Sequence, residues 1–426
     1  MMIGWLFGGF ALLVAANVAV GIALLMAVVL AMMATGTDLP LAVISQRMFV
    51  GMDSFALIAI PAFLLAGEIM ARGAMARRMV EFASTMVGHF RGGLSVVGVL
   101  STMLFSGVSG SSVANTAAIG SVLVPQMRKR GYDPAFAGAV VANAGVLGSV
   151  FPPSIPLVLY GIAAGVSIGS LFIAGIVPGI LMVVLLIAVG YWQSVKAGYP
   201  AAQRASVGDF GRSLGRAFLA LMTPVIMVGG IVSGILTVTE AAVATVIYAL
   251  IVELAFYREL KFRDLPSVTT RAVISTGIVM LIIAASTLFG WIMTIEEIPQ
   301  TIAHFLLGLT ASVVVQLLLI NVLLLIIGTF LDVAPGIIIA VPILVPLADA
   351  LGIDPVHFGV IVVINLLIGL VTPPVAPTLV VGASIAGVSL DRITAASWRF
   401  FLSLILALVL ITYIPALSTW LPGLLG

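Results

Sequence analysis

The fold of this chain is decided by the stretch Phe105-Ser-Gly-Val-Ser-Gly-Ser-Ser112, which lies in the middle of the apolar segment 92–127. Basic residues flank this segment on both sides, at Arg91 and at 128–130. Because Lys and Arg collect in cytoplasmic loops, both ends are expected on one side of a membrane. Two full crossings need roughly 40 residues plus a turn, but the segment has only about 36. The pattern therefore predicts a re-entrant helical hairpin with a polar tip at mid-membrane.

The composition around this hairpin is that of a polytopic helical membrane protein. The chain has 426 residues, of which 62% are hydrophobic and 8% charged, and its mean hydropathy is +1.31. A soluble domain is about half apolar and a quarter charged. The apolar runs are continuous rather than alternating, which favours helices over a β-barrel. With no cysteine, no histidine cluster and no nucleotide-binding or hydrolase motif, the sequence indicates neither an enzyme nor direct use of ATP.

The basic residues also predict the topology. All of them except Arg47 fall into five groups, and one arrangement places every group in the cytoplasm and both termini outside. This arrangement needs about ten spans, near 2–16, 18–35, 52–71, 134–168, 170–193, 217–238, 240–257, 268–293, 355–388 and 400–421. The alternative for 2–35 is one long tilted helix, which would reverse the N-terminus. The first run lacks a basic n-region and a cleavage site, so we expect a retained membrane segment rather than a signal peptide.

An internal repeat relates the two halves of the chain at an offset of 221 residues. Gly131-Tyr-Asp-Pro134 recurs as Gly352-Ile-Asp-Pro355, and Pro152-Pro153 recurs as Pro373-Pro374. The first tip corresponds to the sequence around Gly328, in a second hairpin at 312–348 that only acidic residues flank, which places it outside. Segments 72–91 and 294–311 precede the hairpins and are expected to be amphipathic arms. Inverted repeats with broken helices are typical of secondary transporters.

The hairpin tips and the Pro-Pro breaks are expected to meet at mid-membrane. Proline frees main-chain carbonyls, which together with Ser, Thr and Asn oxygens suit Na⁺, and the N-termini of half-helices suit a carboxylate. The alternatives are close helix packing through small residues at the first tip, and plain kinks at the prolines. The first-tip residues in question are Ser106, Ser109, Ser111, Ser112, Asn115 and Thr116.

Further polar residues in apolar surroundings are candidates for function. Asp332 lies at the second tip, where it would be a cation ligand, a proton carrier or simply a cap of the following half-helix. Arg47 would lie outside and could pair with a substrate carboxylate; the alternative is an interfacial side chain that snorkels or pairs with Asp38 or Asp53. Asn143 and Asn365 would either support the tips by hydrogen bonds or pack between helices.

These residues resemble the large membrane subunit of a tripartite ATP-independent periplasmic (TRAP) transporter, over essentially the whole chain. The segments that carry the resemblance are Gln46-Arg47, 59–67, 105–115, 151–154, 328–332 and 372–374. It implies a bacterial inner-membrane protein that imports organic acids, usually carboxylates, with Na⁺ as the coupling ion. It also implies two partners, a small four-helix membrane subunit and a periplasmic substrate-binding protein, and no nucleic acid. The alternatives are a standalone Na⁺- or H⁺-coupled symporter of similar architecture, and a passive channel or scaffold.

The resemblance further implies an elevator-type transporter, in which a transport domain slides against a scaffold. Scaffold helices are then expected at 1–71 and, with a cytoplasmic loop, at 194–293; arms at 72–91 and 294–311; and transport repeats at 92–193 and 312–426, with broken helices at 134–168 and 355–388. The matched motifs place one Na⁺ site at Ser106, Ser112, Asn115, Gly145, Gly148 and Pro152, and a second at Gly328, Gly369, Thr372 and Pro373. Substrate contacts are expected from Arg47, Ser109, Ser111, Asp332 and Thr372.

Overall fold

The structure is a computed structural model that describes residues 2–16, 18–36, 40–201, 204–310 and 312–425. Over these residues every regular element is a helix, apart from one isolated β-bridge between Arg91 and Ala201. Eight helical segments in this part are long and apolar enough to cross a membrane: Phe55–Arg72, Ile168–Lys196, Val207–Val232, Val238–Tyr257, Phe262–Ile295, Val313–Phe330, Val333–Ala350 and Leu390–Tyr413. The predicted all-α polytopic fold is confirmed.

The N-terminal region supplies helices that pack on the middle of the chain. Residues 2–35 form two helices, α1 (Met2–Ala15) and α2 (Val20–Thr35), and not one long helix. The chain continues through α3 (Leu41–Met52), a short 3-10 turn η1 (Phe55–Ile58) and α4 (Ala59–Arg72). Helices α2, α3 and α4 all pack against α13 (Leu265–Ile295), and α4 also packs against α12 (Val238–Ile251).

The first repeat contains a hairpin followed by a broken helix and a long helix. Its elements are α5 (Met75–Val87), α6 (Gly93–Ser109), α7 (Ser112–Lys129), α8 (Pro134–Gly145), η2 (Val146–Ser149), α9 (Ile155–Ala164) and α10 (Ile168–Lys196). The broken helix begins sharply because Asp133 accepts a hydrogen bond of 3.0 Å from the backbone N–H of Phe136, and proline, which lacks a free N–H, occupies the first helical position.

The second repeat follows the same order. Its elements are α14 (Ile298–Leu309), α15 (Val313–Phe330), α16 (Val333–Ala350), α17 (Pro355–Gly369), α18 (Pro377–Ala386), α19 (Leu390–Tyr413) and α20 (Ala416–Leu425). Asp354 caps α17 as Asp133 caps α8, accepting a bond of 2.8 Å from the N–H of His357. Between the repeats lie α11 (Val207–Val232), α12 with a π-helical end η3 (Val252–Tyr257), η4 (Phe262–Asp264) and α13.

Several predicted spans differ from the observed helices. The predicted spans 2–16 and 18–35 are helices of only 14 and 16 residues. Those at 134–168 and 355–388, which were predicted to be broken helices, are each divided into short helices at the Pro-Pro sequences. The predicted last span, 400–421, is wrong in its bounds: α19 starts at Leu390 and ends at Tyr413, and α20 begins after Pro415. Proline disfavours a helical conformation at the residue before it, which separates these two helices.

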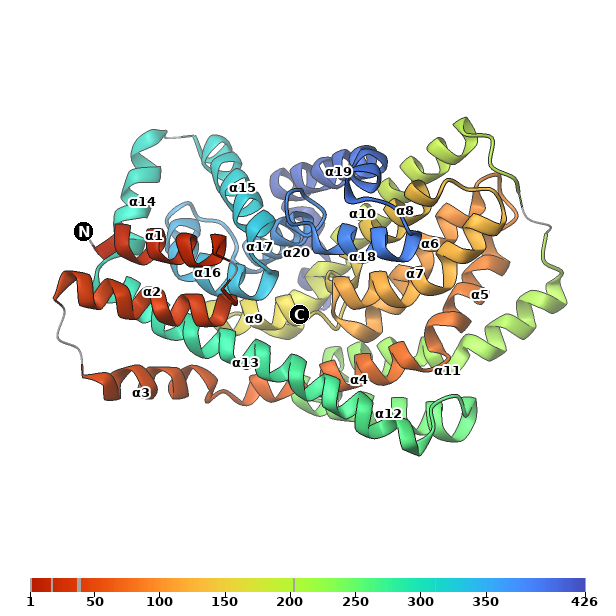
Figure 1. Cartoon of the computed structure of the whole chain (residues 1–426), viewed down its shortest axis with the longest axis horizontal. Helices are drawn as coiled ribbons and strands as arrows, with labels where there is room; N and C mark the ends of the chain where they lie inside the picture. Colours follow the sequence, from red (N-terminus) through yellow and green to blue (C-terminus); the bar gives the residue numbers. More distant parts are fainter. Residues whose placement is uncertain (1, 17, 37–39, 202–203, 311, 426) are drawn as a thin grey trace.

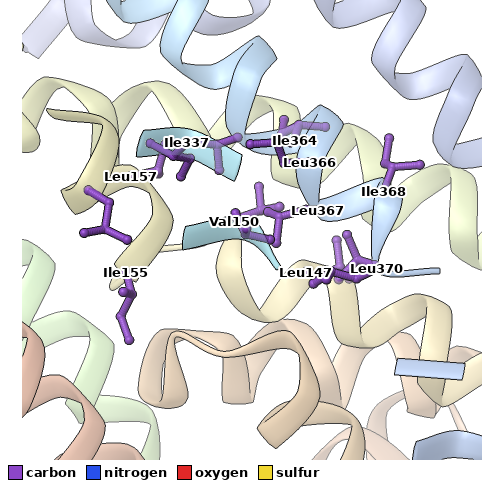
Figure 2. Packing of buried hydrophobic residues seen from close by; sticks show 14 of the residues in the cluster. Leu147, Val150, Ile155, Leu157, Ile337, Ile364, Leu366, Leu367, Ile368 and Leu370 are labelled. Atoms are coloured by element: carbon purple, nitrogen blue, oxygen red, sulfur yellow. The ribbon is translucent and has the colours of Figure 1, made fainter. Parts of the chain in front are cut away.

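The two hairpins approach each other from opposite ends of the molecule, with α6 and α7 on the right of Figure 1 and α15 and α16 on the left. Each hairpin packs on its own broken helix and on the second half of the other one: α7 contacts α8 and α18, and α16 contacts α17 and α9. Apolar residues of 147–157, α16 and α17, such as Val150, Ile337 and Leu367, fill the space between the repeats (Figure 2). The inverted repeats therefore share one core.

Candidate functional site

The two hairpin tips border one cavity of about 320 Å³. Residues 110–113 of the first tip and 332–334 of the second both line it. The remaining wall comes from the breaks of the two repeats and from α4 and α13. The first break and the helix after it contribute Ser149, Ile155, Pro156 and Leu159, the second break contributes Leu370, and α4 and α13 contribute Leu64 and Val279. The predicted meeting of the tips is thus observed, although more than 200 residues separate them in the sequence.

The first tip is tied to its broken helix by hydroxyl groups. Ser112 donates a hydrogen bond of 3.1 Å to the hydroxyl of Ser149, and that hydroxyl donates one of 3.0 Å to the carbonyl oxygen of Gly110. Ser111 caps α7 by accepting a bond of 3.4 Å from the N–H of Ala114. Gly110 has φ +59°, a left-handed conformation that glycine adopts at little cost. Together these contacts fix the turn between α6 and α7 against the break.

Behind the first tip, side chains of α7 pack directly on glycines at the end of the broken helix. A Cβ atom on Gly145 would lie 1.9 Å from the Thr116 hydroxyl, and one on Gly148 would lie 2.2 Å from the Asn115 amide nitrogen. Asn115 is fully buried and donates a bond of 3.3 Å to the hydroxyl of Ser106. The first predicted Na⁺ set is therefore gathered in one place, as a buried cluster of hydroxyl, amide and backbone oxygens.

The second tip touches its broken helix through the backbone. A Cβ atom on Gly369 would lie 2.2 Å from the carbonyl carbon of Gly328, so the two backbone segments approach as closely as glycine permits. Thr372 donates a bond of 2.9 Å to the carbonyl oxygen of Ile368. Pro373 is exposed, whereas Pro152 in the first repeat is buried. The second predicted Na⁺ set is also brought together, with few side-chain oxygens.

Asp332 is the only acidic residue among those that line the cavity. It occupies the N-cap of α16, where its carboxylate accepts a hydrogen bond of 2.7 Å from the N–H of Val333. A negative charge at a helix N-terminus is stabilised by the aligned peptide dipoles. Its position thus fits the capping role considered from the sequence, while the roles of cation ligand and proton carrier remain predictions.

Three predicted substrate contacts lie elsewhere or cannot be placed. Thr372 is not among the cavity residues. Arg47 is not among the cavity residues; its guanidinium lies 4.7 Å from the ring centre of Trp291, in a cation–π contact between α3 and α13. The predicted alternative partner Asp38 lies outside the described residues. The side chain of Ser109 also lies outside what the structure describes. Contact of these residues with substrate remains a prediction.

Two serines of the site were missed in the sequence, and two asparagines have another role. Ser149 joins the tip to the break, and Ser154 caps α9 by accepting a bond of 3.2 Å from the N–H of Leu157. In the sequence, the only indication of a role for Ser149 and Ser154 is their position beside Gly148 and Pro152-Pro153. Asn143 donates a bond of 3.0 Å to Ser397, and Asn365 donates one of 2.8 Å to the side chain of Asn321. Their hydrogen bonds thus hold neighbouring helices together and do not reach the tips.

The arrangement defines a class of protein. An all-helical chain with opposed hairpins and two broken helices around one central cavity has the architecture of a secondary transporter.

A family model described as the tripartite ATP-independent periplasmic transporter, DctM component, matches residues 7–417. The chain belongs to this family and is the large membrane subunit of a TRAP transporter, a multi-pass protein of the bacterial inner membrane and not an enzyme. The resemblance seen in the sequence is confirmed.

Relatives in this family match almost the entire chain. The isethionate TRAP transporter permease protein DctMQ of Oleidesulfovibrio alaskensis is 41% identical over 419 residues, which cover 98% of this chain and 66% of that protein. The sialic acid TRAP transporter large permease protein SiaM of Vibrio cholerae is 38% identical over 423 residues, 99% of both chains. The crystal structure of the Alcanivorax borkumensis YdaH transporter, 17% identical, aligns with a TM-score of 0.64 over 91% of this chain and 90% of that one, which shows a shared fold.

Proposed function

We propose that this chain carries an organic acid, of the carboxylate class, into the cell as the large subunit of a three-component transporter that uses Na⁺ as its coupling ion. The observation that carries the proposal is the single cavity onto which both hairpin tips open. In inverted-repeat transporters, substrate and coupling ions bind where the two repeats meet near the membrane centre.

An anionic substrate fits the helix ends around the cavity. The first residues of α7, α9 and α16 all line it, so three helix N-termini point their partial positive charge to the same space. No Lys or Arg is among the lining residues. An anion would therefore be held by backbone N–H groups and by hydroxyl groups such as that of Ser111. The relatives named for isethionate and for sialic acid are both named for organic acids.

Na⁺ is proposed as the coupling ion because of the groups behind each tip. Behind the first tip, the hydroxyls of Ser106 and Ser112 and the side chain of Asn115 are buried close to the backbone of 145–152. Behind the second, the backbones of Gly328 and Gly369 touch near Thr372. Unwound backbone carbonyls and neutral oxygens in this setting are typical Na⁺ ligands of secondary transporters.

An elevator motion is proposed because the cavity has two kinds of wall. One wall consists of the tips and breaks of the two repeats, which share one core, and the other consists of residues from α4 and α13. If the hairpins and broken helices move together along α4 and α13, the cavity moves with them across the membrane. The predicted division into transport repeats and scaffold helices follows from this proposal.

Two partners complete the proposed transporter. The family description names a tripartite periplasmic transporter of which this chain matches one component. We expect a small four-helix membrane subunit beside this chain and a periplasmic binding protein that delivers substrate, and no nucleic acid. Substrate choice would then rest largely on the binding protein, because the cavity itself presents few polar side chains.

The test is uptake into proteoliposomes that contain this chain and the small subunit. A thermal-shift screen of the binding protein against organic acids first identifies the substrate, which is then supplied in labelled form. We expect uptake that needs both the binding protein and an inward Na⁺ gradient. Uptake that is unchanged when K⁺ replaces Na⁺ would contradict the Na⁺ coupling. Uptake that needs no binding protein would instead favour the standalone symporter.

A further inference from the structure

The charges around the cavity between the hairpin tips limit which organic acids it can hold. Among the described residues that line it, Asp332 alone is charged, and none is Lys or Arg. Helices α7, α9 and α16 begin at this cavity, so their backbone N–H groups supply positive partial charge. The N–H groups of a first turn have no acceptor inside the helix unless the N-cap residue supplies one. The number that remain free at each helix start therefore decides how many carboxylates the cavity can bind.

Helix α7 offers two adjacent N–H groups. Ser111 accepts a bond from the N–H of Ala114 with its side chain, at 3.4 Å, and one from that of Asn115 with its carbonyl oxygen, at 3.0 Å. In the described structure no acceptor bonds to the N–H groups of Ser112 and Val113, the first two residues of the helix, and both residues line the cavity. Two neighbouring donors match the two oxygens of one carboxylate.

Helices α9 and α16 offer fewer donors, because a proline lies near the start of each. Pro156, the second residue of α9, has no N–H, and the N–H of Leu157 bonds to the N-cap serine. Pro335 is the third residue of α16, and the N–H of Val333 bonds to the Asp332 carboxylate. In the part of the chain that the structure describes, each of these first turns thus retains one N–H group, and that of α16 already has a carboxylate beside it.

The hydroxyl groups that line the cavity bond mainly to the protein. The hydroxyl of Ser112 donates to Ser149, and that of Ser149 donates to the carbonyl oxygen of Gly110. The third hydroxyl, that of Ser111, caps α7. A substrate body with many hydroxyl groups would leave most of them without partners, and burying unpaired polar groups weakens binding.

Much of the remaining wall is apolar and comes from separate parts of the fold. Leu64 of α4, Val279 of α13 and Leu159 of α9 line the cavity, together with Leu370 at the second break. These side chains suit a hydrocarbon body, because apolar contact removes surface from water. A second carboxylate on that body would lie against them or beside Asp332, where no described Lys or Arg could pair with it.

We propose that this cavity admits organic acids with one carboxylate and a mainly apolar body, and that it excludes dicarboxylates and polyhydroxylated acids. The carboxylate binds at the first turn of α7, and the body lies against Leu64, Leu159 and Val279. This inference rests on the proposed function, because it requires the substrate to occupy this cavity. The binding protein then selects among acids of this class.

The test compares three acids with equal numbers of carbon atoms: hexanoate has one carboxylate and an apolar body, adipate has a second carboxylate, and gluconate has a hydroxyl group on each remaining carbon. The full chain, purified with its small subunit and without the binding protein, is unfolded thermally in Na⁺ at increasing concentrations of each acid. A ligand that binds the folded state raises the unfolding temperature, and the concentration dependence gives its dissociation constant. We expect hexanoate to bind about tenfold more tightly than adipate or gluconate.

A matched pair of variants tests whether the acids bind in this cavity. Val279→Thr places a hydroxyl group in the apolar wall, so we expect weaker binding of hexanoate and tighter binding of gluconate, which lowers the preference for hexanoate about threefold. Val273→Thr, at an exposed position of the same helix outside the cavity, is the control and should keep the preference of the unmodified chain. An unchanged preference in Val279→Thr overturns the assignment to this cavity.

The outcomes separate this inference from the proposed function. Adipate or gluconate binding as tightly as hexanoate overturns the inference, whereas Na⁺-driven uptake of an organic acid into proteoliposomes then still supports the proposed function. The inference also fails if none of the three acids raises the unfolding temperature. If uptake is absent as well, the proposed function fails with it.

Discussion

The first and second hairpin tips border the same cavity, yet they contact their broken helices in different ways. The first tip is joined to its break by hydroxyl hydrogen bonds and by a buried amide, whereas the second is joined by the contact of two glycine backbones. At the offset of 221 residues, Ser106, Ser112, Asn115 and Ser149 correspond to Ile327, Val333, Gly336 and Leu370. These four polar residues of the first repeat are thus replaced by apolar residues in the second.

The features that the repeats do share are those that fix the backbone. Gly148 corresponds to Gly369, the Pro-Pro sequences coincide, and Asp133 and Asp354 cap equivalent helices. The N-caps of α7 and α16, the second helix of each hairpin, also coincide, since Ser111 corresponds to Asp332. One backbone arrangement therefore carries neutral oxygens at one tip and a single carboxyl group at the other, so we expect the duplicated halves to have separate tasks at the cavity.

The largest effect is expected from Gly369→Ala, which tests the backbone contact of the second tip. Its Cβ would lie 2.2 Å from the Gly328 carbonyl carbon, and backbone cannot rotate away. Overpacking usually costs 1–3 kcal/mol, and here we expect about 3 kcal/mol or no folded protein. Thermal unfolding in detergent measures it. Gly277→Ala, at a position on α13 where an added Cβ meets no atom within 4 Å, is the matched control and should leave stability unchanged or raise it by up to about 1 kcal/mol, because alanine favours a helix more than glycine does. Equal unfolding temperatures for both variants would contradict the proposed contact.

A smaller loss of stability is expected from Gly145→Ala, behind the first tip. A second substitution should restore part of the lost stability. The added Cβ would meet the Thr116 hydroxyl at 1.9 Å, a side chain that can be removed. We expect a cost of about 2 kcal/mol, of which Thr116→Ala recovers at least half, because the atom in conflict is then absent. The same unfolding assay on both single variants and the double variant gives the coupling. If the stability changes of the two single substitutions simply add in the double variant, the first tip does not differ from the second in having a removable side chain as the source of the clash.

These differences mark the limit of what the sequence could predict. The duplication, the hairpins and the starts of α8 and α17 were predictable, because glycine, proline and N-cap residues act on the adjacent backbone. The role of Ser149 was not predictable, because its partners Ser112 and Gly110 lie 37 and 39 residues away in the same repeat and meet it only when the hairpin packs on its broken helix. The position of Arg47 over Trp291 depends on a contact between α3 and α13 that no local pattern shows.

The charge at the second tip is tested by Asp332→Asn, which keeps a good N-cap and removes the charge. We expect uptake to fall about tenfold, with a changed dependence on Na⁺, while the unfolding temperature stays close to that of the unmodified chain. Asp349→Asn, which removes an exposed acid in the last turn of the same helix, is the control and should not alter uptake. Normal uptake by the Asp332 variant would leave this residue with a capping role alone.

The smallest effect is expected from Ser111→Ala, the equivalent position at the first tip. Loss of this cap should cost about 1 kcal/mol of stability, because the N–H of Ala114 loses its acceptor. Ser121→Ala is the control, since that hydroxyl bonds only to the preceding turn, at Ala118. If Ser111 also contacts the substrate, uptake should fall by more than the loss of folded protein explains. A decrease in uptake that matches the decrease in folded protein would assign the anion to the helix N-termini and exclude the Ser111 hydroxyl.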